Sequence, residues 1–164
     1  MSDLASLERR LAALEEVEAI KRLKYRYWRH LDLKQWDELA DCFAPDATVS
    51  YGDGQYSFRG VGEIMKFLRE SLGKERGSVT IHQGHHPEID LTGATTAKGT
   101  WALYNYMFNE GQNRGIRIGA YYYDDYVKLA GEWKFQHIGY QTLFHEEWRR
   151  DELESLVLLG KPPG

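Results

Sequence analysis

The chain has 164 residues, which fits a single domain that buries its own core without disulfide or metal support. The formal net charge is -4 and no basic run stands out, so we expect no nucleic-acid partner. The single cysteine, Cys42, cannot form an intramolecular disulfide, which favours a reducing compartment. No run approaches the ~20 apolar residues that span a bilayer, and the acidic start at Met1–Leu4 is unlike a signal peptide. These features predict a cytoplasmic protein without a membrane partner.

Apolar residues recur every three or four positions from Leu4 to Leu31. This spacing predicts one amphipathic helix of roughly 40 Å, longer than a domain of this size needs. Its first part, residues 1–14, can therefore reach beyond its own core. The leucines in that part either contact another subunit or pack on the chain's own sheet, and the spacing leaves both open.

The remaining elements follow in the order helices, then strands. We expect a short helix at Gln35–Phe43, two strands at Ala47–Tyr51 and Tyr56–Arg59, and a third helix at Val61–Leu72. Four longer strands are expected at Ser78–Leu91, Ala94–Asn109, Ile116–Leu129 and Glu132–Glu146, and a short helix within Glu147–Leu159. Short turns between the long strands predict an antiparallel meander. Together these elements predict an α+β fold, with one layer of helix against one face of a sheet.

Three of the six histidines lie within five positions, as His82, His85 and His86. Such a cluster indicates a proton-handling site. Regular alternation puts His82 and His86 on one face of the strand and His85 on the other, but Gly84 and Pro87 favour a bulge that leaves the facing of His85 and His86 open. His82 and His86 would lie about 13 Å apart on a regular strand, too far to share one ion, so we expect no metal site.

Asp32 closes the long helix, against the negative end of the helix dipole, where its protonated form is favoured and it would suit a general base. The segment Asp32–Gln35 also has the spacing of a capping box for the second helix, so a structural role competes.

Asn105 interrupts an otherwise apolar row formed by Trp101, Leu103 and Met107 on one face of its strand. A buried amide without partners costs about 1–3 kcal/mol, so Asn105 should be bonded to a structural neighbour or to a ligand. No Gly-rich nucleotide motif and no Gly-x-Ser-x-Gly elbow occurs. The residues therefore favour acid–base chemistry without a cofactor, or binding alone.

The sequence resembles the SnoaL-like family of the nuclear-transport-factor-2-like fold in four segments, Tyr25–Trp36, Phe43–Ala47, His82–Ile89 and Gly99–Leu103. In motif it is most similar to scytalone-dehydratase-like and bile-acid-dehydratase-like proteins. The resemblance implies a cone-shaped, curved antiparallel sheet packed against three N-terminal helices. It covers about residues 15–148 of a single domain spanning 1–164, with a helical extension at 1–14 and a tail at 149–164. The exposed sheet face usual in such cones adds to the leucine pattern, and we expect a homo-oligomer, a dimer or a trimer.

The resemblance also implies a set of site residues. The group uses a Tyr and an Asp of the first helix, a His of the third strand, a carboxylate or amide of the next strand and a second Tyr. The matching positions are Tyr27, Asp32, His82, Asn105 and Tyr51. Asn105 stands where the bile-acid type has Asp, and an amide can orient a partner but cannot carry a proton.

From the residues and the resemblance we predict a cofactor-free, dehydratase-like lyase that takes a proton next to a carbonyl in a small hydrophobic cyclic substrate. His82 paired with Asp32 would be the base, and Tyr27 or Tyr51 would bond the enolate oxygen. Further substrate contacts would come from His85, Asn105, Trp28, Trp101, Leu103, Met107 and Phe144. The alternatives are a ketosteroid-type isomerase or polyketide cyclase using the same pocket, and a non-catalytic module for ligand binding or assembly.

Overall fold

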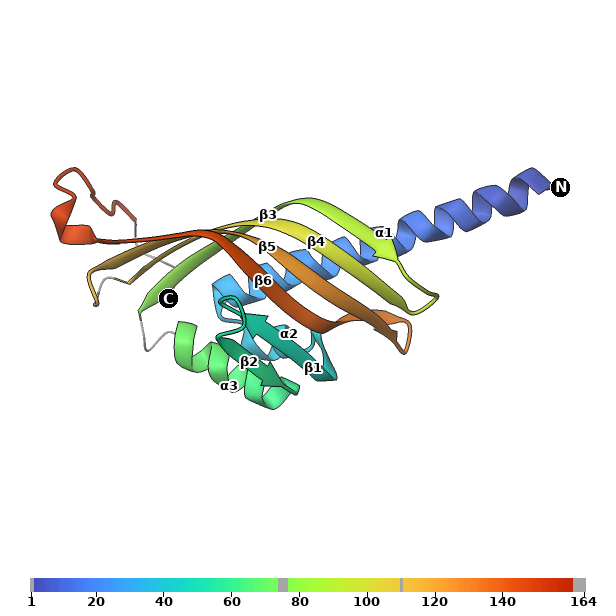
Figure 1. Ribbon diagram of the computed structural model, residues 1–164, viewed down its shortest axis with the longest axis horizontal. Coiled ribbons are helices and arrows are strands. Elements are labelled where there is room, and N and C mark those ends of the chain that lie inside the picture. The colour runs from blue at the N-terminus through green and yellow to red at the C-terminus, as the bar shows by residue number, and fades with distance from the viewer. Residues whose placement is uncertain (1, 74–76, 110, 161–164) are drawn as a thin grey trace.

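The computed structural model of the chain describes residues 2–73, 77–109 and 111–160. Its helices are α1 (Ser2–Leu33), α2 (Trp36–Ala40) and α3 (Val61–Leu72), with a 3-10 turn η2 (Arg150–Glu152) near the C-terminus. Its strands are β1 (Phe43–Tyr51), β2 (Tyr56–Arg59), β3 (Ser78–Leu91), β4 (Thr96–Asn109), β5 (Arg114–Leu129) and β6 (Glu132–Arg149). Figure 1 shows an arched sheet with the helices gathered on one side.

The α+β fold with a curved sheet is confirmed, and the third helix and the third strand have the predicted bounds. The strand order is β2-β1-β6-β5-β4-β3. The prediction of a purely antiparallel sheet is wrong for one pair, because β1 runs parallel to β6 while the other neighbours are antiparallel. α3 and the meander intervene between these two strands, so β6 returns beside β1 in the same direction. The sheet is therefore mixed.

Sheet pairing changes two predicted helices: the second is shorter than expected, and the one in the tail is replaced by a 3-10 turn. The second helix ends at Ala40, since Phe43 already pairs with Phe135 of β6. In the predicted tail, β6 continues to Arg149 opposite Arg114 of β5, and only a 3-10 turn follows in place of the expected helix. Residues 161–164 of the tail lie outside the described residues.

The core lies between α1 and the inner face of the sheet, which is the face that the helices cover. The buried side of α1 carries Ile20, Leu23, Tyr27, Trp28 and Leu31. These residues belong to one cluster with the sheet residues Trp101, Tyr122, Tyr126, Phe135 and Ile138 and with Ile64, Met65 and Leu68 of α3. Successive side chains of β5 point to opposite faces of the sheet, so Tyr121 and Tyr123, on either side of the buried Tyr122, are exposed on the outer face.

A buried ion pair crosses this core. The Lys24 ammonium of α1 donates to Asp124 of β5 at 2.7 Å, and both side chains are fully buried. The Tyr126 hydroxyl donates to the same carboxylate oxygen at 2.8 Å and accepts from the Trp101 indole at 2.9 Å. Lys24 Nζ also lies 3.6 Å from the centre of the Tyr122 ring. Burial lowers the pKa of Lys24 to about 8, although Asp124 opposes the shift.

The first half of α1 projects beyond the sheet (Figure 1). Leu4, Leu7, Leu11 and Leu14 are between 50 and 67% exposed. The interpretation that these leucines pack on the chain's own sheet is therefore wrong, and the subunit contact stays a prediction. Among the described helices none is both long and apolar enough to cross a bilayer.

Replacing Asp124 by Asn strands the Lys24 charge in the core, so we expect the free energy of unfolding to fall by about 3–5 kcal/mol. Adding Lys24→Met removes that charge while the introduced amide still accepts from Tyr126, so the double variant should regain most of the loss. Denaturant unfolding followed by circular dichroism measures both values. A double variant no more stable than Asp124→Asn would contradict this account.

Replacing Leu7 and Leu11 together by Glu should lower the particle mass in light scattering, because charged side chains would break an apolar contact between subunits. Arg9→Glu, an exposed change beside the stripe, is the matched control and should leave the mass unchanged. An unaltered mass in the leucine variant would argue against a contact through this stripe.

Candidate functional site

His82 and Asp32 meet where the end of α1 reaches β3. His82 Nδ1 and Asp32 Oδ1 are 2.6 Å apart, and the His82 backbone N–H donates to Oδ2 at 2.9 Å. The Thr80 hydroxyl donates to Oδ1 at 2.9 Å. Because an ionised carboxylate only accepts hydrogen bonds, Nδ1 is the donor in this arrangement, and in the neutral imidazole the lone pair is then on Nε2. The dyad therefore presents a base, and it joins two residues fifty positions apart.

Asp32 does not cap the second helix. The N-cap residue of α2 is Gln35, and no side chain makes a capping hydrogen bond there. The oxygens of Asp32 accept from Thr80 and His82 instead. The capping-box interpretation is wrong because the end of α1 turns the carboxylate toward the sheet.

A mostly apolar cavity of about 780 Å³ lies between α1 and the edge strand β3, and the dyad is part of its wall. The residues that line it are Tyr25, Trp28, Arg29, Asp32, Leu33, Val79, Thr80, Ile81, His82, Gln83, Gly84, His85, Tyr106 and Phe108. The side chains of His82 and Asp32 are only 9% and 17% exposed. Water therefore screens their interaction less than it would at the surface.

Trp28 forms part of this wall because β3 has a glycine beneath it. A Cβ atom at Gly84 would lie 1.7 Å from Cη2 of Trp28, so the indole packs directly on the bare backbone. The Trp28 ring also meets Trp101 edge-to-face, with ring centres 5.3 Å apart. Trp28 lines the cavity, whereas Trp101 is fully buried behind it and is not among the lining residues, so substrate contact by either ring stays a prediction.

Asn105 stands directly opposite His82 in the sheet and is buried, as its neighbour Leu103 is. Met107 is half-buried and stands opposite Thr80. The predicted row of β4 therefore shares the inner face with the dyad, and the amide lies in register with the imidazole.

Tyr27 and Tyr51 form a separate pair in the core. Their hydroxyl oxygens are 3.1 Å apart, and neither residue is among those that line the cavity beside His82. Burial raises the pKa of both phenols well above the usual value, so both stay protonated at neutral pH. Their role as hydrogen-bond donors to substrate stays a prediction.

Phe144 lies on the outer face of the sheet, so the prediction that it lines the pocket is wrong. Its ring covers Gly119, where a Cβ atom would come within 2.2 Å of it. The cause is a bulge in β6: Gly119 pairs with Phe144 while Ala120 pairs with Thr142, which leaves one extra residue. The same bulge places His145 opposite Ile118, where its side chain stays exposed. No sequence signal marked this bulge.

The expected irregularity in β3 is confirmed. The pairing with β4 shifts between His85 and Glu88, and His86 has a positive φ of 50°. His85 pairs with Ala102 and lines the cavity, while His86 does not.

Two further polar residues at the dyad were not predicted. Thr80 could have been found, because it lies two positions before His82 and so shares its face. Lys34, whose ammonium donates to the Thr80 hydroxyl at 3.2 Å, gave no signal in the sequence. Within the described residues, no three or more His, Cys, Asp or Glu side chains gather closely enough to hold a metal ion.

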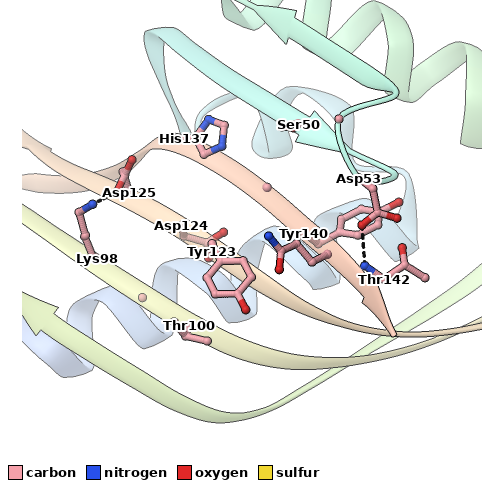
Figure 2. A pocket seen from close by; sticks show the side chains of 14 residues that line it. Ser50, Asp53, Lys98, Thr100, Tyr123, Asp124, Asp125, His137, Tyr140 and Thr142 are labelled. Atoms are coloured by element: carbon pink, nitrogen blue, oxygen red, sulfur yellow. Dashed lines mark hydrogen bonds and ion pairs between the residues drawn. The ribbon is translucent and has the colours of Figure 1, made fainter. Parts of the chain in front are cut away.

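A second, polar cavity of about 740 Å³ is formed by β4, β5, β6 and the turn after β1 (Figure 2). Its charged groups are engaged with other residues of the chain. Asp125 pairs with Lys98 at 3.6 Å, Asp53 accepts the Thr142 N–H at 2.8 Å, and His137 bonds the Thr48 hydroxyl at 2.7 Å. This cavity contains neither member of the dyad, so the first cavity is the better candidate.

The sequence matches the SnoaL-like domain over residues 12–139. Among solved structures, a Novosphingobium aromaticivorans protein provisionally described as a scytalone dehydratase is 24% identical, with a TM-score of 0.77 over 92% of this chain and 97% of the other. The hexachlorocyclohexane dehydrochlorinase LinA-type3 from Novosphingobium barchaimii is 21% identical, with a TM-score of 0.76 over 93% and 99%. ActVI-ORFA from Streptomyces coelicolor is 12% identical, with a TM-score of 0.67 over 79% and 98%. These likenesses show the fold.

Replacing Gly84 by Ala should push Trp28 off β3, because the new methyl group would overlap the indole. We expect the free energy of unfolding to fall by about 1–3 kcal/mol and the tryptophan fluorescence to change. Gly62→Ala is the control, since nothing lies within 4 Å of its added Cβ on α3; it should be neutral or stabilising by up to about 1 kcal/mol. Equal stability of the two variants would refute the close packing of Trp28 on Gly84.

Proposed function

The chain belongs to the SnoaL-like domain family, and from this premise we propose that it is a cofactor-free lyase of the dehydratase type. Its substrate would be a small, hydrophobic, cyclic molecule with a carbonyl group and a hydroxyl group on the second carbon from it. The observation that carries the proposal is the His82–Asp32 dyad in the wall of an apolar cavity.

The first step is proton abstraction by His82. Nε2 takes the proton from the carbon next to the carbonyl, and the electron pair moves toward the carbonyl oxygen to give an enolate. Asp32 holds the opposite ring nitrogen and stabilises the imidazolium that forms. This matches the logic of a base oriented by a carboxylate.

The second step is loss of the hydroxyl group. The enolate electron pair forms the carbon–carbon double bond, the carbon–oxygen bond breaks, and the imidazolium of His82 returns its proton to the departing oxygen. The products are a conjugated enone and water, and His82 is neutral again. Asn105 opposite His82 can bond the substrate without taking a proton, and Tyr27 or Tyr51 would donate to the enolate oxygen once substrate is bound.

Two similarities support an elimination. The names of two similar structures describe a dehydratase and a dehydrochlorinase, both of which remove a small molecule from neighbouring carbons. An isomerase would share the enolate step but return the proton to another carbon. A product lighter than its substrate by the mass of water would separate the two.

Two observations support an enzyme over the alternative of a module that only binds a ligand. A binding-only role would be favoured if His82 and Asp32 were too far apart to hydrogen-bond, or if Asp32 capped α2. The two side chains are 2.6 Å apart, and α2 has no side-chain cap.

Replacing His82 by Ala should lower turnover by about 10²–10⁴-fold, because the base is lost. Asp32→Asn should also lower turnover, because the carboxylate that holds the His82 ring in its Nδ1-protonated tautomer is lost. The substrate is first identified by screening cyclic hydroxy-ketones for the absorbance of a conjugated enone. His86→Asn is the matched control, since His86 lies on the same strand but outside the cavity wall. Full activity in folded His82→Ala protein would overturn the proposal.

A further inference from the structure

The end of α1 holds a lysine where a glycine is usual. The Gln35 N–H bonds the His30 carbonyl at 2.9 Å and the Lys34 N–H bonds the Leu31 carbonyl at 3.3 Å. This is the Schellman pattern, whose left-handed residue is most often Gly. Here that residue is Lys34, with a φ of 60°. A side chain with a Cβ atom is strained in this conformation, and strain of this kind concentrates at functional sites.

The conformation carries the Lys34 side chain to the dyad. Its ammonium donates to Thr80 Oγ1 at 3.2 Å, and the same hydroxyl donates to Asp32 Oδ1 at 2.9 Å. Asp32 Oδ1 in turn lies 2.6 Å from His82 Nδ1. Lys34, Thr80, Asp32 and His82 therefore form one continuous chain of contacts.

The charges along this chain oppose each other. An ionised Asp32 on its own favours the protonated imidazolium of His82, and a base that is already protonated cannot abstract a proton. A cation close to Asp32 weakens that effect. Lys34 is partly buried, and burial lowers its pKa to about 8 while Asp32 acts to raise it. Lys34 is therefore mostly a cation at neutral pH.

We propose that Lys34 is a positioning residue of this site, whose ammonium, held by Thr80, offsets the charge of Asp32 and so keeps His82 unprotonated and ready to act as a base. The proposal deepens the proposed function and rests on it for the role of His82. The other titratable side chains that line the cavity are Arg29 and Tyr25 on α1, His85 on β3 and Tyr106 on β4. Arg29 is exposed, so water screens its charge more than that of Lys34.

The test is the titration of His82 in substrate-free protein, followed by NMR of the histidine side chains and assigned with His82→Ala. In Lys34→Met the titration midpoint of His82 should rise by roughly 0.5–1 pH unit, as expected for loss of a nearby, partly screened charge. Lys34→Arg keeps the charge and should stay near the wild-type midpoint. Lys66→Met removes an exposed lysine of α3 and should leave the midpoint unchanged.

The outcomes are separable. A rise below about 0.3 unit in Lys34→Met, or a fall, overturns the proposal, as does an equal rise in Lys66→Met. If Lys34→Met does not fold, Lys34→Gly serves in its place, because Gly relieves the positive φ and should raise the unfolding midpoint. The titration needs no substrate. A lack of activity would therefore refute the proposed function, while the effect of Lys34 on the titration midpoint of His82 could still be measured.

Discussion

The buried ion pair between Lys24 and Asp124 fixes how α1 lies across the sheet. Lys24, Trp28 and Asp32 are each four residues apart, so they follow one side of the helix over about 12 Å. The ion pair anchors the first of them on β5, Trp28 then packs on Gly84 of β3, and Asp32 reaches His82 two residues earlier on the same strand. α1 therefore crosses the sheet obliquely toward its edge. A helix rotated by one residue would lose all three contacts together, so the ion pair and the dyad depend on the same orientation of α1.

This constraint is better understood as specifying an arrangement than as adding stability. Burial lowers the pKa of Lys24 and raises that of Asp124, so in both residues removal from water outweighs the attraction of the partner charge. A native pKa below the unfolded value for a lysine, or above it for an aspartate, means that the fold disfavours the charged form. An apolar pair of similar volume would cost less. What the charges provide is a specific partner: several aromatic rings surround Lys24, and the Asp124 carboxylate, itself held by Tyr126, gives the ammonium a directed contact among them.

The spacing of apolar residues along the sequence correctly predicted single helices and strands, whose patterns are local. The pattern of Ile64, Phe67, Leu68 and Leu72 marked α3, and alternation marked β3, within the observed bounds. Two failures have a non-local cause: the parallel pairing of β1 with β6 and the bulge that turns Phe144 outward are set by neighbouring strands. At the site, the approach of Asp32 to His82 followed from the family resemblance, since no local pattern relates residues fifty positions apart. Lys34 was missed because sequence rules expect glycine at a left-handed helix end.

The geometry of Asp32 also decides which group can meet a substrate. A carboxylate offers about four lone-pair positions, and three protein donors already occupy three of them: the Thr80 hydroxyl, the His82 backbone N–H and His82 Nδ1. A substrate proton would have to displace one of these contacts, each of which also ties α1 to β3. The imidazole has no such restriction, because its Nε2 is free of the carboxylate. In the proposed reaction proton transfer would therefore pass through His82, and Asp32, which the sequence suggested as a base in its own right, would act by holding that ring in place.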